Sequence, residues 1–417
     1  MATGKHMNRL LQGDVGSGKT IVALMTSLIA FDNNYQTCLM APTEILAIQH
    51  YESIKKSANN LNINISLLTG STKKKDREKI NFELKNGNIN LIVGTHTLIE
   101  SKIIFKNLGL AIIDEQHRFG VAQRSKLWKK NLIPPHILIM SATPIPRTLS
   151  MTLYGDVDIS SIKEMPPGRK KIETYLRNDS KRLNVFKFIS SQIKKGRQVY
   201  IVYPLIEESK KMDYKDLMDG FESISRYFPL PEFKISIIHG KMKSKDKDYE
   251  MKRFVNGETQ IMVATTVIEV GVNVPNASVI IIESAERFGL SQLHQLRGRV
   301  GRGNHQSYCI LMSSRKLSDD SKKRLNTMVE YSDGFKIADV DLKLRGPGDV
   351  SGTKQSGLIK FKIVDIIGDQ KLIKITRELA KEILNKDPDL LNKNNLNINN
   401  VYKSIYMGEK NIWNYIS

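Results

Sequence analysis

Short apolar segments alternate with helical segments through roughly residue 315, and this alternation limits the folds open to the chain more than any other feature. Segments with nearly continuous apolar content are typical of strands buried on both faces of a parallel sheet. Strands that alternate with helices in this way build parallel α/β sheets. The predicted strands are 37–42, 64–70, 89–95, 110–115 and 136–144 in the first half, and 198–206, 234–240, 259–266, 277–284 and 307–313 in the second.

A charged and turn-rich stretch, KEMPPGRKKIET (163–174), interrupts this alternation and is interpreted as a linker. After about residue 316 the sequence becomes helical and polar, and its asparagine-rich stretch 385–400 is predicted to be loop or weakly ordered. A chain of 417 residues is too long for one ordinary core. We therefore predict two α/β parallel-sheet domains in tandem, at 1–160 and 161–315, and a small, mostly helical region at 316–417.

The composition bears on the cellular compartment of the chain. No apolar run approaches the roughly eighteen residues of a membrane helix, and the opening MATGKHMNRL lacks the apolar centre of a signal peptide. Cys38 and Cys309 both lie in apolar runs, so we expect two buried thiols without a disulfide, which suits a reducing cytoplasm. The eight histidines show no metal-ligand spacing with these cysteines.

The formal net charge of +21 and the isoelectric point near 9.7 suit a polyanionic partner such as nucleic acid. The same charge could reflect an AT-rich genome, because lysine, asparagine and isoleucine are all abundant. The basic clusters at 72–79 and 241–253 include acidic residues and are typical of solvated helix faces. Charge alone leaves both interpretations open.

The stretch LLQGDVGSGKT (10–20) matches the phosphate-binding pattern G-x-x-x-x-G-K-[ST]. An apolar run (7–12) precedes it and a segment with helical spacing (20–31) follows, which is the context of a phosphate loop. Backbone N–H groups would cradle the phosphates of ATP, Lys19 would contact the β- and γ-phosphates, and Thr20 would ligate Mg²⁺. The alternative is a glycine turn that binds nothing. The predicted nucleotide-binding residues are Gly13, Asp14, Gly16, Ser17, Gly18, Lys19 and Thr20.

Asp114 and Glu115 end the apolar segment LAIIDE, which would place two carboxylates at the carboxyl edge of a parallel sheet. Asp114 would hold Mg²⁺, and Glu115 would orient or deprotonate the attacking water. In SATPIPRT (141–148), the hydroxyls of Ser141 and Thr143 could bond to these carboxylates and respond to the γ-phosphate. Taken alone, the acidic pair could be a solvated strand end, and SATPIPRT a turn stiffened by proline.

Arg299 and Arg302 belong to the segment HQLRGRVGRG (294–303). Because they are three residues apart, they would share one face of a helix. Guanidinium groups stabilise charge on a transferring phosphoryl group and can be supplied by another domain. The two domains would then face each other with ATP at their seam, whereas the alternative is a surface cluster of arginines.

In their order along the chain, these motifs resemble the motor of superfamily 2 helicases. More narrowly, RLLQGDVGSGKT, DEQHRFGV, SATPIPRTL and LRGPGDVSGTKQSG (344–357) are similar to motifs of the RecG family of bacterial branched-DNA translocases. The resemblance extends over nearly the whole chain and weakens toward its end. It implies two RecA-like domains and an ATP- and Mg²⁺-dependent DNA helicase or translocase. Such a protein would remodel stalled forks and Holliday junctions in repair and recombination, in the bacterial cytoplasm.

The resemblance also implies roles that the patterns alone do not assign. Thr43, Thr95 and His96 would bind DNA phosphates without reading bases, and Gln295 would reach the γ-phosphate beside the arginines. The stretch 265–277 would couple DNA contacts to the nucleotide, and 344–357 would couple hydrolysis to movement along duplex DNA. The residues expected in this coupling, besides Ser141 and Thr143, are Thr265, Thr266, Glu269, Gly271, Arg345, Gly348 and Gln355.

RecG-family proteins carry a wedge domain and a glutamine-bearing helix that recognises adenine in front of the motor, and this sequence shows neither. We therefore expect a monomeric motor portion, with the wedge absent or supplied by another chain. Two other interpretations stay open. One is a transcription-repair coupling factor, whose partner is RNA polymerase, although Ser17 and Gln116-His117 favour RecG. The other is a truncated chain that binds ATP or DNA without productive unwinding. An RNA helicase is disfavoured by the stretch 344–357.

Overall fold

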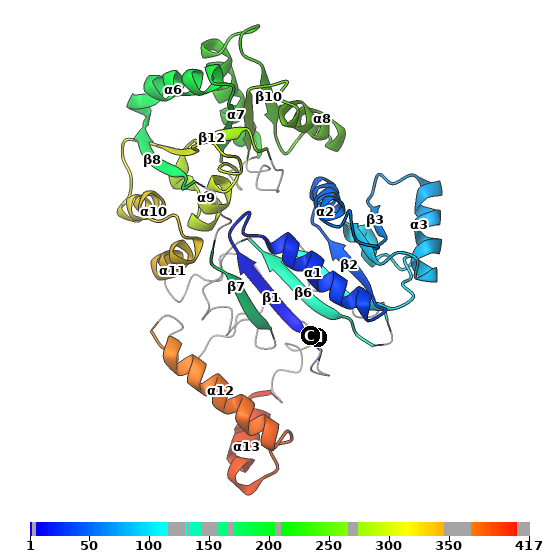
Figure 1. The fold of residues 1–417 in the computed structure, drawn as a ribbon. Coiled ribbons are helices and arrows are strands. Elements are labelled where there is room, and N and C mark those ends of the chain that lie inside the picture. Colours follow the sequence, from blue (N-terminus) through cyan, green and yellow to red (C-terminus); the bar gives the residue numbers. More distant parts are fainter. Residues whose placement is uncertain are drawn as a thin grey trace.

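The computed structural model describes residues 1, 6–115, 130–131, 133–142, 157–164, 170–204, 210–265, 274–345 and 368–406. Two parallel β-sheets form two lobes, each with helices packed on its sheet (Figure 1). This arrangement confirms the predicted tandem of α/β domains. Among the described residues, no helix combines the length and the apolar character needed to cross a membrane.

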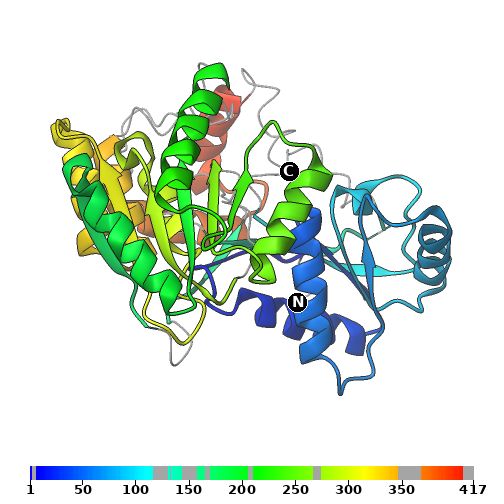
Figure 2. The same ribbon diagram turned by 90° about the horizontal axis from the view of Figure 1, so that it is seen from above.

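The first lobe is built on seven parallel strands in the order β3-β4-β2-β5-β6-β1-β7. Strand β2 (Gln36–Met40) is buried on both faces, because Cys38 and Met40 join one core cluster and Leu39 joins another. Helices α1 and α2 lie side by side on this lobe (Figure 2). The other elements are β1 (Asn8–Gly13), α1 (Lys19–Asp32), α2 (Glu44–Ser57), β3 (Ile65–Leu68), α3 (Lys74–Asn86), β4 (Leu91–Gly94), η1 (His96–Ile99), β5 (Leu108–Asp114), β6 (His136–Ser141) and β7 (Asp158–Ile162).

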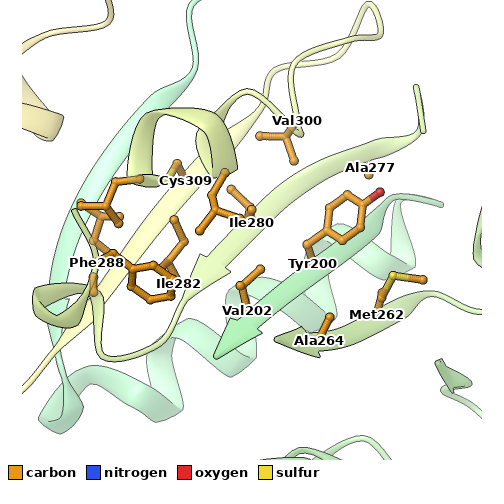
Figure 3. Packing of buried hydrophobic residues seen from close by; sticks show 14 of the residues in the cluster. Tyr200, Val202, Met262, Ala264, Ala277, Ile280, Ile282, Phe288, Val300 and Cys309 are labelled. Atoms are coloured by element: carbon orange, nitrogen blue, oxygen red, sulfur yellow. The ribbon is translucent and has the colours of Figure 1, made fainter. Parts of the chain in front are cut away.

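The second lobe is built on six parallel strands in the order β10-β11-β9-β12-β13-β8. Tyr200, Ile280 and Phe288 are almost fully buried in the core on one face of this sheet (Figure 3). The elements are β8 (Glu173–Asn178), η3 (Asp179–Lys181), α6 (Arg182–Lys194), β9 (Gln198–Tyr203), α7 (Lys210–Tyr227), β10 (Ile235–Ile238), α8 (Ser244–Val255), β11 (Ile261–Thr265), β12 (Ala277–Ile282), η5 (Ala285–Arg287), α9 (Leu290–Arg297) and β13 (Tyr308–Ser313).

Two helices beyond residue 316 pack on the second lobe. Helix α10 (Asp319–Glu330) contributes Leu325 and Met328 to the same core cluster as the sheet, and α11 (Gly334–Arg345) contributes Ile337. All three side chains are at most 1% exposed. The helical region that follows the second sheet is therefore joined to it by a common core, at least as far as α11.

Two edge strands were not predicted. Strand β7 (DISSI) pairs with β1, and β8 (ETYLRN) pairs with β13. Because β8 begins at Glu173, the predicted linker 163–174 is wrong for its last two residues, 173 and 174. Neither strand contains a fully buried residue. An edge strand that is partly solvated needs no continuous apolar run, so its sequence is not distinguished from a charged connection.

The polar end of the chain is more regular than expected. Helix α12 (Gln370–Lys386), the short η6 (Lys393–Asn395) and α13 (Leu396–Tyr406) follow one another there, apart from both sheets in Figure 1. The predicted loop at 385–400 is therefore wrong for 385–386, which end α12, for 393–395, which form η6, and for 396–400, which begin α13. The Asp387 carboxylate accepts hydrogen bonds from the Asn392 N–H at 2.9 Å and from the Asn395 side chain at 2.8 Å. Here the asparagine-rich composition supplies partners that order the turn between the helices.

The two cysteines occupy the cores of separate lobes. Cys38 lies on β2 and Cys309 on β13, and both are free and fully buried. Burial raises the pKa of each thiol to about 12, so both stay protonated and unreactive at neutral pH. This confirms that they are core residues.

Candidate active site between the two lobes

Three neighbouring strands of the first sheet end at one edge and carry the predicted motifs there. In the sheet order β5-β6-β1, these strands end at Asp114, Ser141 and Gly13 respectively. The carboxyl edge of a parallel sheet is where ligands bind in α/β proteins. Parallel pairing thus brings together segments that are distant in sequence.

The predicted phosphate loop connects β1 to α1, as the pattern requires. Gly16 and Gly18 have φ angles of 79° and 94°, which is the left-handed region that favours glycine. A Cβ atom on Gly13 would lie 2.4 Å from Ser17 Oγ, so that position also needs glycine. Ser17 Oγ is buried and has no hydrogen-bond partner among the described residues. The loop is therefore tightly turned and carries one buried hydroxyl without a hydrogen-bond partner among the described residues.

Lys19, the first residue of α1, folds back over the loop. Its Nζ donates hydrogen bonds to the carbonyl oxygens of Gly13 at 2.7 Å and Asp14 at 2.9 Å. Burial lowers the pKa of Lys19, although the charges of Asp114 and Glu115 oppose this effect. The ammonium group therefore lies between the loop and the carboxylates.

Asp114 and Glu115 have pKa values shifted in opposite directions. Burial and the adjacent charge of Asp114 raise the pKa of Glu115 to about 7. Burial acts most strongly and would raise the pKa of Asp114, but the hydrogen bond from His50 and the charges of His50 and Lys19 together lower that pKa. When the pKa values of two neighbouring carboxyl groups are shifted apart, the group with the lower pKa, here Asp114, stays ionised. The group with the higher pKa, here Glu115, can accept a proton near neutral pH.

The backbone at Glu115 is unusual for its residue type. Its φ angle is 53°, which non-glycine residues rarely adopt. The Glu115 N–H donates to the Met140 carbonyl at 2.9 Å, and its Oε1 accepts from the Ala142 N–H at 3.2 Å. The end of β6 thus holds both the backbone and the carboxylate of Glu115. Such strain is often found at functional sites.

His50 was not singled out from the sequence, yet it lies between two predicted metal ligands. Its Nε2 is 2.8 Å from Asp114 Oδ2, and its Nδ1 is 3.5 Å from Thr20 Oγ1. The signal available in the sequence was only its place in the segment APTEILAIQHY. The histidine is brought there by the packing of α2 beside α1.

The second lobe presents arginines to this edge of the first lobe. Arg299 is 5% exposed and lies near enough to Glu115 for its charge to act against the raised pKa of that carboxyl. Arg302 likewise contributes to the lowered pKa of Lys19, after burial. Gln295 is 8% exposed, on α9 of the same lobe. The charges of both lobes therefore converge on one place.

The predicted common helix of Arg299 and Arg302 is wrong. Helix α9 ends at Arg297, Gly298 follows as its cap, and Gly301 has a φ angle of 76°. Both arginines therefore stand in the turn that follows the helix, where Gly301 takes the left-handed conformation. Their convergence on the first lobe comes from this turn and not from a shared helix face.

A direct contact joins the phosphate loop to α9. His294 Nε2 lies 3.0 Å from Asp14 Oδ1, and Arg297 Nη2 lies 3.0 Å from His294 Nδ1. Since a guanidinium can only donate, His294 Nδ1 accepts, and its hydrogen on Nε2 is donated to Asp14. Burial acts to raise the pKa of Asp14, but this bond and one from the Gly334 N–H lower it overall. Both lobes and the start of α11 thus meet at Asp14.

The donor set fits a Mg²⁺-bound nucleotide. Thr20 and Asp114 offer the hard oxygen ligands that Mg²⁺ prefers, and they flank the same histidine. The described residues contain no cluster of three or more His, Cys, Asp or Glu that could hold a metal alone. Mg²⁺ is usually held by one or two protein ligands together with substrate phosphates, and the loop with the buried Ser17 Oγ could bind those phosphates.

Comparison with known proteins identifies the family of the chain. Three family profiles match successive parts of it: DEAD/DEAH box helicase at 1–152, helicase conserved C-terminal domain at 180–304, and ATP-dependent DNA helicase RecG, domain 3, C-terminal at 331–417. The chain is 50% identical over 384 residues to the ATP-dependent DNA helicase RecG of Synechocystis sp., covering 92% of this chain and 46% of that protein. The chain belongs to the RecG family. It is also 49% identical over 396 residues to the RecG helicase of Aquifex aeolicus, covering 94% of this chain and 50% of that one.

A solved RecG structure has the same fold. It is described as RecG bound to a three-way DNA junction, and it aligns with a TM-score of 0.74 and 45% identity over 89% of this chain and 48% of that one. The chain thus spans about half the length of the curated RecG relatives that it matches.

Of the remaining residues that the RecG resemblance singled out, the structure describes the side chains of Thr43, Thr95, His96 and Thr265. Thr43 caps α2, with its Oγ1 3.4 Å from the Leu46 N–H, and the buried Thr95 precedes η1. His96 is exposed at the start of η1. Thr265 ends β11, and its Oγ1 has no hydrogen-bond partner in the described part of the chain. Thr143, Thr266, Glu269, Gly271, Gly348, Gln355 and the side chain of Arg345 lie outside the described residues.

Proposed function

We propose that the chain is the ATP-driven motor of a RecG-type DNA helicase, which moves on duplex DNA and remodels stalled forks and Holliday junctions in repair and recombination. One observation carries this proposal. The phosphate loop and carboxylates of the first lobe face Arg299 and Arg302 of the second lobe, and Asp14 and His294 make a direct contact 3.0 Å long across the seam. A nucleotide bound there would touch both lobes.

The proposed roles follow from the chemistry of each side chain. Lys19 would bind the β- and γ-phosphates, and Thr20 with Asp114 would hold Mg²⁺. When bound, Mg²⁺ would neutralise charge on the phosphate oxygens. Glu115, with its pKa of about 7, would accept a proton from the attacking water near neutral pH.

The second lobe would complete the reaction centre. Arg299 and Arg302 would stabilise the charge that develops on the transferring phosphoryl group, and Gln295 would contact the γ-phosphate. ATP would therefore draw the lobes together, and loss of the γ-phosphate would weaken that attraction. Alternate closing and opening of lobes that each hold DNA would step the protein along a duplex.

DNA would be held mainly through its backbone. Thr43, Thr95 and His96 are proposed to contact phosphates, and the net charge of +21 favours a polyanion in general. The relative of known structure is described as bound to a three-way DNA junction. Backbone contacts predict little sequence preference and affinity that falls steeply with salt, with a logarithmic slope of about 0.9 for each neutralised phosphate.

The setting is proposed from the relatives and the cysteines. Relatives from bacteria and two buried, unreactive thiols favour a bacterial cytoplasm. A monomer remains our expectation, and a wedge that splits the fork could come from another part of such a protein or from another chain.

Steady-state ATP hydrolysis tests the proposal. The rate would be measured at low salt without nucleic acid and with single-stranded DNA, duplex DNA, a model fork or RNA. Lys19→Ala is the inactive control, and Lys55→Ala, an exposed residue of α2, is the matched control. We expect stimulation by duplex and fork DNA. Hydrolysis no faster than that of Lys19→Ala, or stimulation by RNA alone, would exclude a DNA motor.

A further inference from the structure

His50 bridges residues from two different elements of the candidate site. It extends from α2 toward Thr20, the second residue of α1, and toward Asp114, the last residue of β5. Its Nε2 is 2.8 Å from Asp114 Oδ2 and its Nδ1 is 3.5 Å from Thr20 Oγ1, the outer limit of a hydrogen bond. Both ring nitrogens thus face side chains that are proposed to hold Mg²⁺.

The packing of α2 fixes this histidine in place. Ala47 and Ile54, three residues before and four residues after it, are buried on the face by which α2 packs on the sheet. The His50 side chain is 12% exposed and that of Asp114 is 11% exposed. The ring therefore has little room to move away from the carboxylate.

The hydrogen positions follow from the partners. An ionised carboxylate only accepts hydrogen bonds, so His50 Nε2 carries a hydrogen and donates it to Asp114 Oδ2. In the tautomer protonated on Nε2, Nδ1 accepts and faces the Thr20 hydroxyl. A hydroxyl that donates to Nδ1 has its lone pairs directed elsewhere, as a metal ligand must. The second oxygen of Asp114 is likewise left for another partner.

We propose that His50 is a positioning residue for the Mg²⁺ of the bound nucleotide, orienting the Thr20 hydroxyl and the Asp114 carboxylate so that both present lone pairs to the metal. This inference rests on the proposed function, because it needs a nucleotide in the loop. Partners that orient metal ligands commonly contribute 10- to 100-fold to metal affinity. A histidine that only fills space between α1, α2 and β5 would affect binding with and without metal alike.

The test separates metal binding from nucleotide binding. Isothermal titration calorimetry would measure the affinity of the whole chain for a non-hydrolysable ATP analogue, once in EDTA and once in excess Mg²⁺. His50→Leu removes both ring nitrogens at similar volume, and His50→Gln keeps a donor for Asp114. His305→Leu, at an exposed histidine of the second lobe, is the matched control.

We expect His50→Leu to leave the affinity for the ATP analogue in EDTA unchanged. The factor by which Mg²⁺ increases that affinity should fall by about 10- to 100-fold. His50→Gln should recover part of this gain, and His305→Leu should behave as the unaltered chain. The Mg²⁺ concentration that half-saturates ATP hydrolysis should rise in parallel for His50→Leu.

Two results would overturn the inference while leaving the proposed function intact. One is a gain from Mg²⁺ in His50→Leu equal to that of the unaltered chain. The other is an equal loss of affinity with and without metal, which would show a purely structural role. If the unaltered chain binds no nucleotide under either condition, the proposed function itself fails.

Discussion

Glu115 offers the sharpest test of the electrostatics of the site, because the group proposed to accept a proton should also destabilise the fold. Burial and the charge of Asp114 raise its pKa from the ordinary 4.5 to about 7. At about 1.4 kcal/mol per pKa unit, this corresponds to about 3 kcal/mol. Since the folded state holds the proton more tightly than the unfolded state, the cost is absent below pH 4.5, grows as pH rises, and is complete above pH 7.

Glu115→Gln removes the charge and keeps the shape. We expect the variant to equal the unaltered chain in stability near pH 4 and to exceed it by up to about 3 kcal/mol near pH 8. Urea unfolding of the nucleotide-free protein at both pH values measures this, using the transition of the first lobe. The exposed Glu52→Gln is the matched control and should show no such difference.

The same substitution should lower the ATP hydrolysis rate by about 10²- to 10⁴-fold, the usual contribution of a general base. A gain in stability together with a loss of rate would assign both effects to one carboxylate. Equal stability of the two proteins at pH 8 would refute the reasoning, because it would mean that the carboxylate ionises in the fold without cost.

Other consequences of the structure can be measured. Gly13→Ala would place a Cβ atom 2.4 Å from a loop hydroxyl and should weaken nucleotide binding about tenfold or more, measured by calorimetry. His294→Leu leaves the partly buried Asp14 without its cross-lobe donor at 3.0 Å, a loss of about 1.5–3 kcal/mol, and should slow ATP hydrolysis about tenfold or more. Arg182→Met leaves the buried Glu283 without its two bonds of 2.7 and 2.9 Å and should destabilise the second lobe by about 3 kcal/mol in urea unfolding, partly recovered by adding Glu283→Gln.

The sequence predicted the inner strands well because strands covered on both faces need continuous apolar residues. Strand β2, whose five residues are all buried, is an example. The edge strands β7 and β8 were not predicted because the sequence of a partly solvated strand resembles that of a polar connection. In contrast, Arg299 and Arg302 were expected on a helix from their spacing, whereas that helix ends at Arg297.

In the candidate site too, some features follow from the local sequence and others depend on tertiary packing. The phosphate loop could be predicted because its function depends on a contiguous backbone conformation, which glycines at fixed positions record. The positions of His50 and His294 could not, because each is set by the packing of one helix against a distant segment. Neither a period nor a spacing in the sequence encodes that contact.

The charges at the seam suggest why the site is divided between two lobes. Burial lowers the pKa of Lys19 and the charge of Arg302 lowers it further, so bringing these cations together is unfavourable without a counter-charge. Asp114 and Glu115 offset part of this, but burial and Asp114 drive Glu115 toward its neutral form. A triphosphate would add negative charge between Lys19 and the arginines of the second lobe and would so strengthen the attraction between the lobes. Closure would then depend on the charge of the ligand, and loss of the γ-phosphate would weaken the attraction that holds the seam closed.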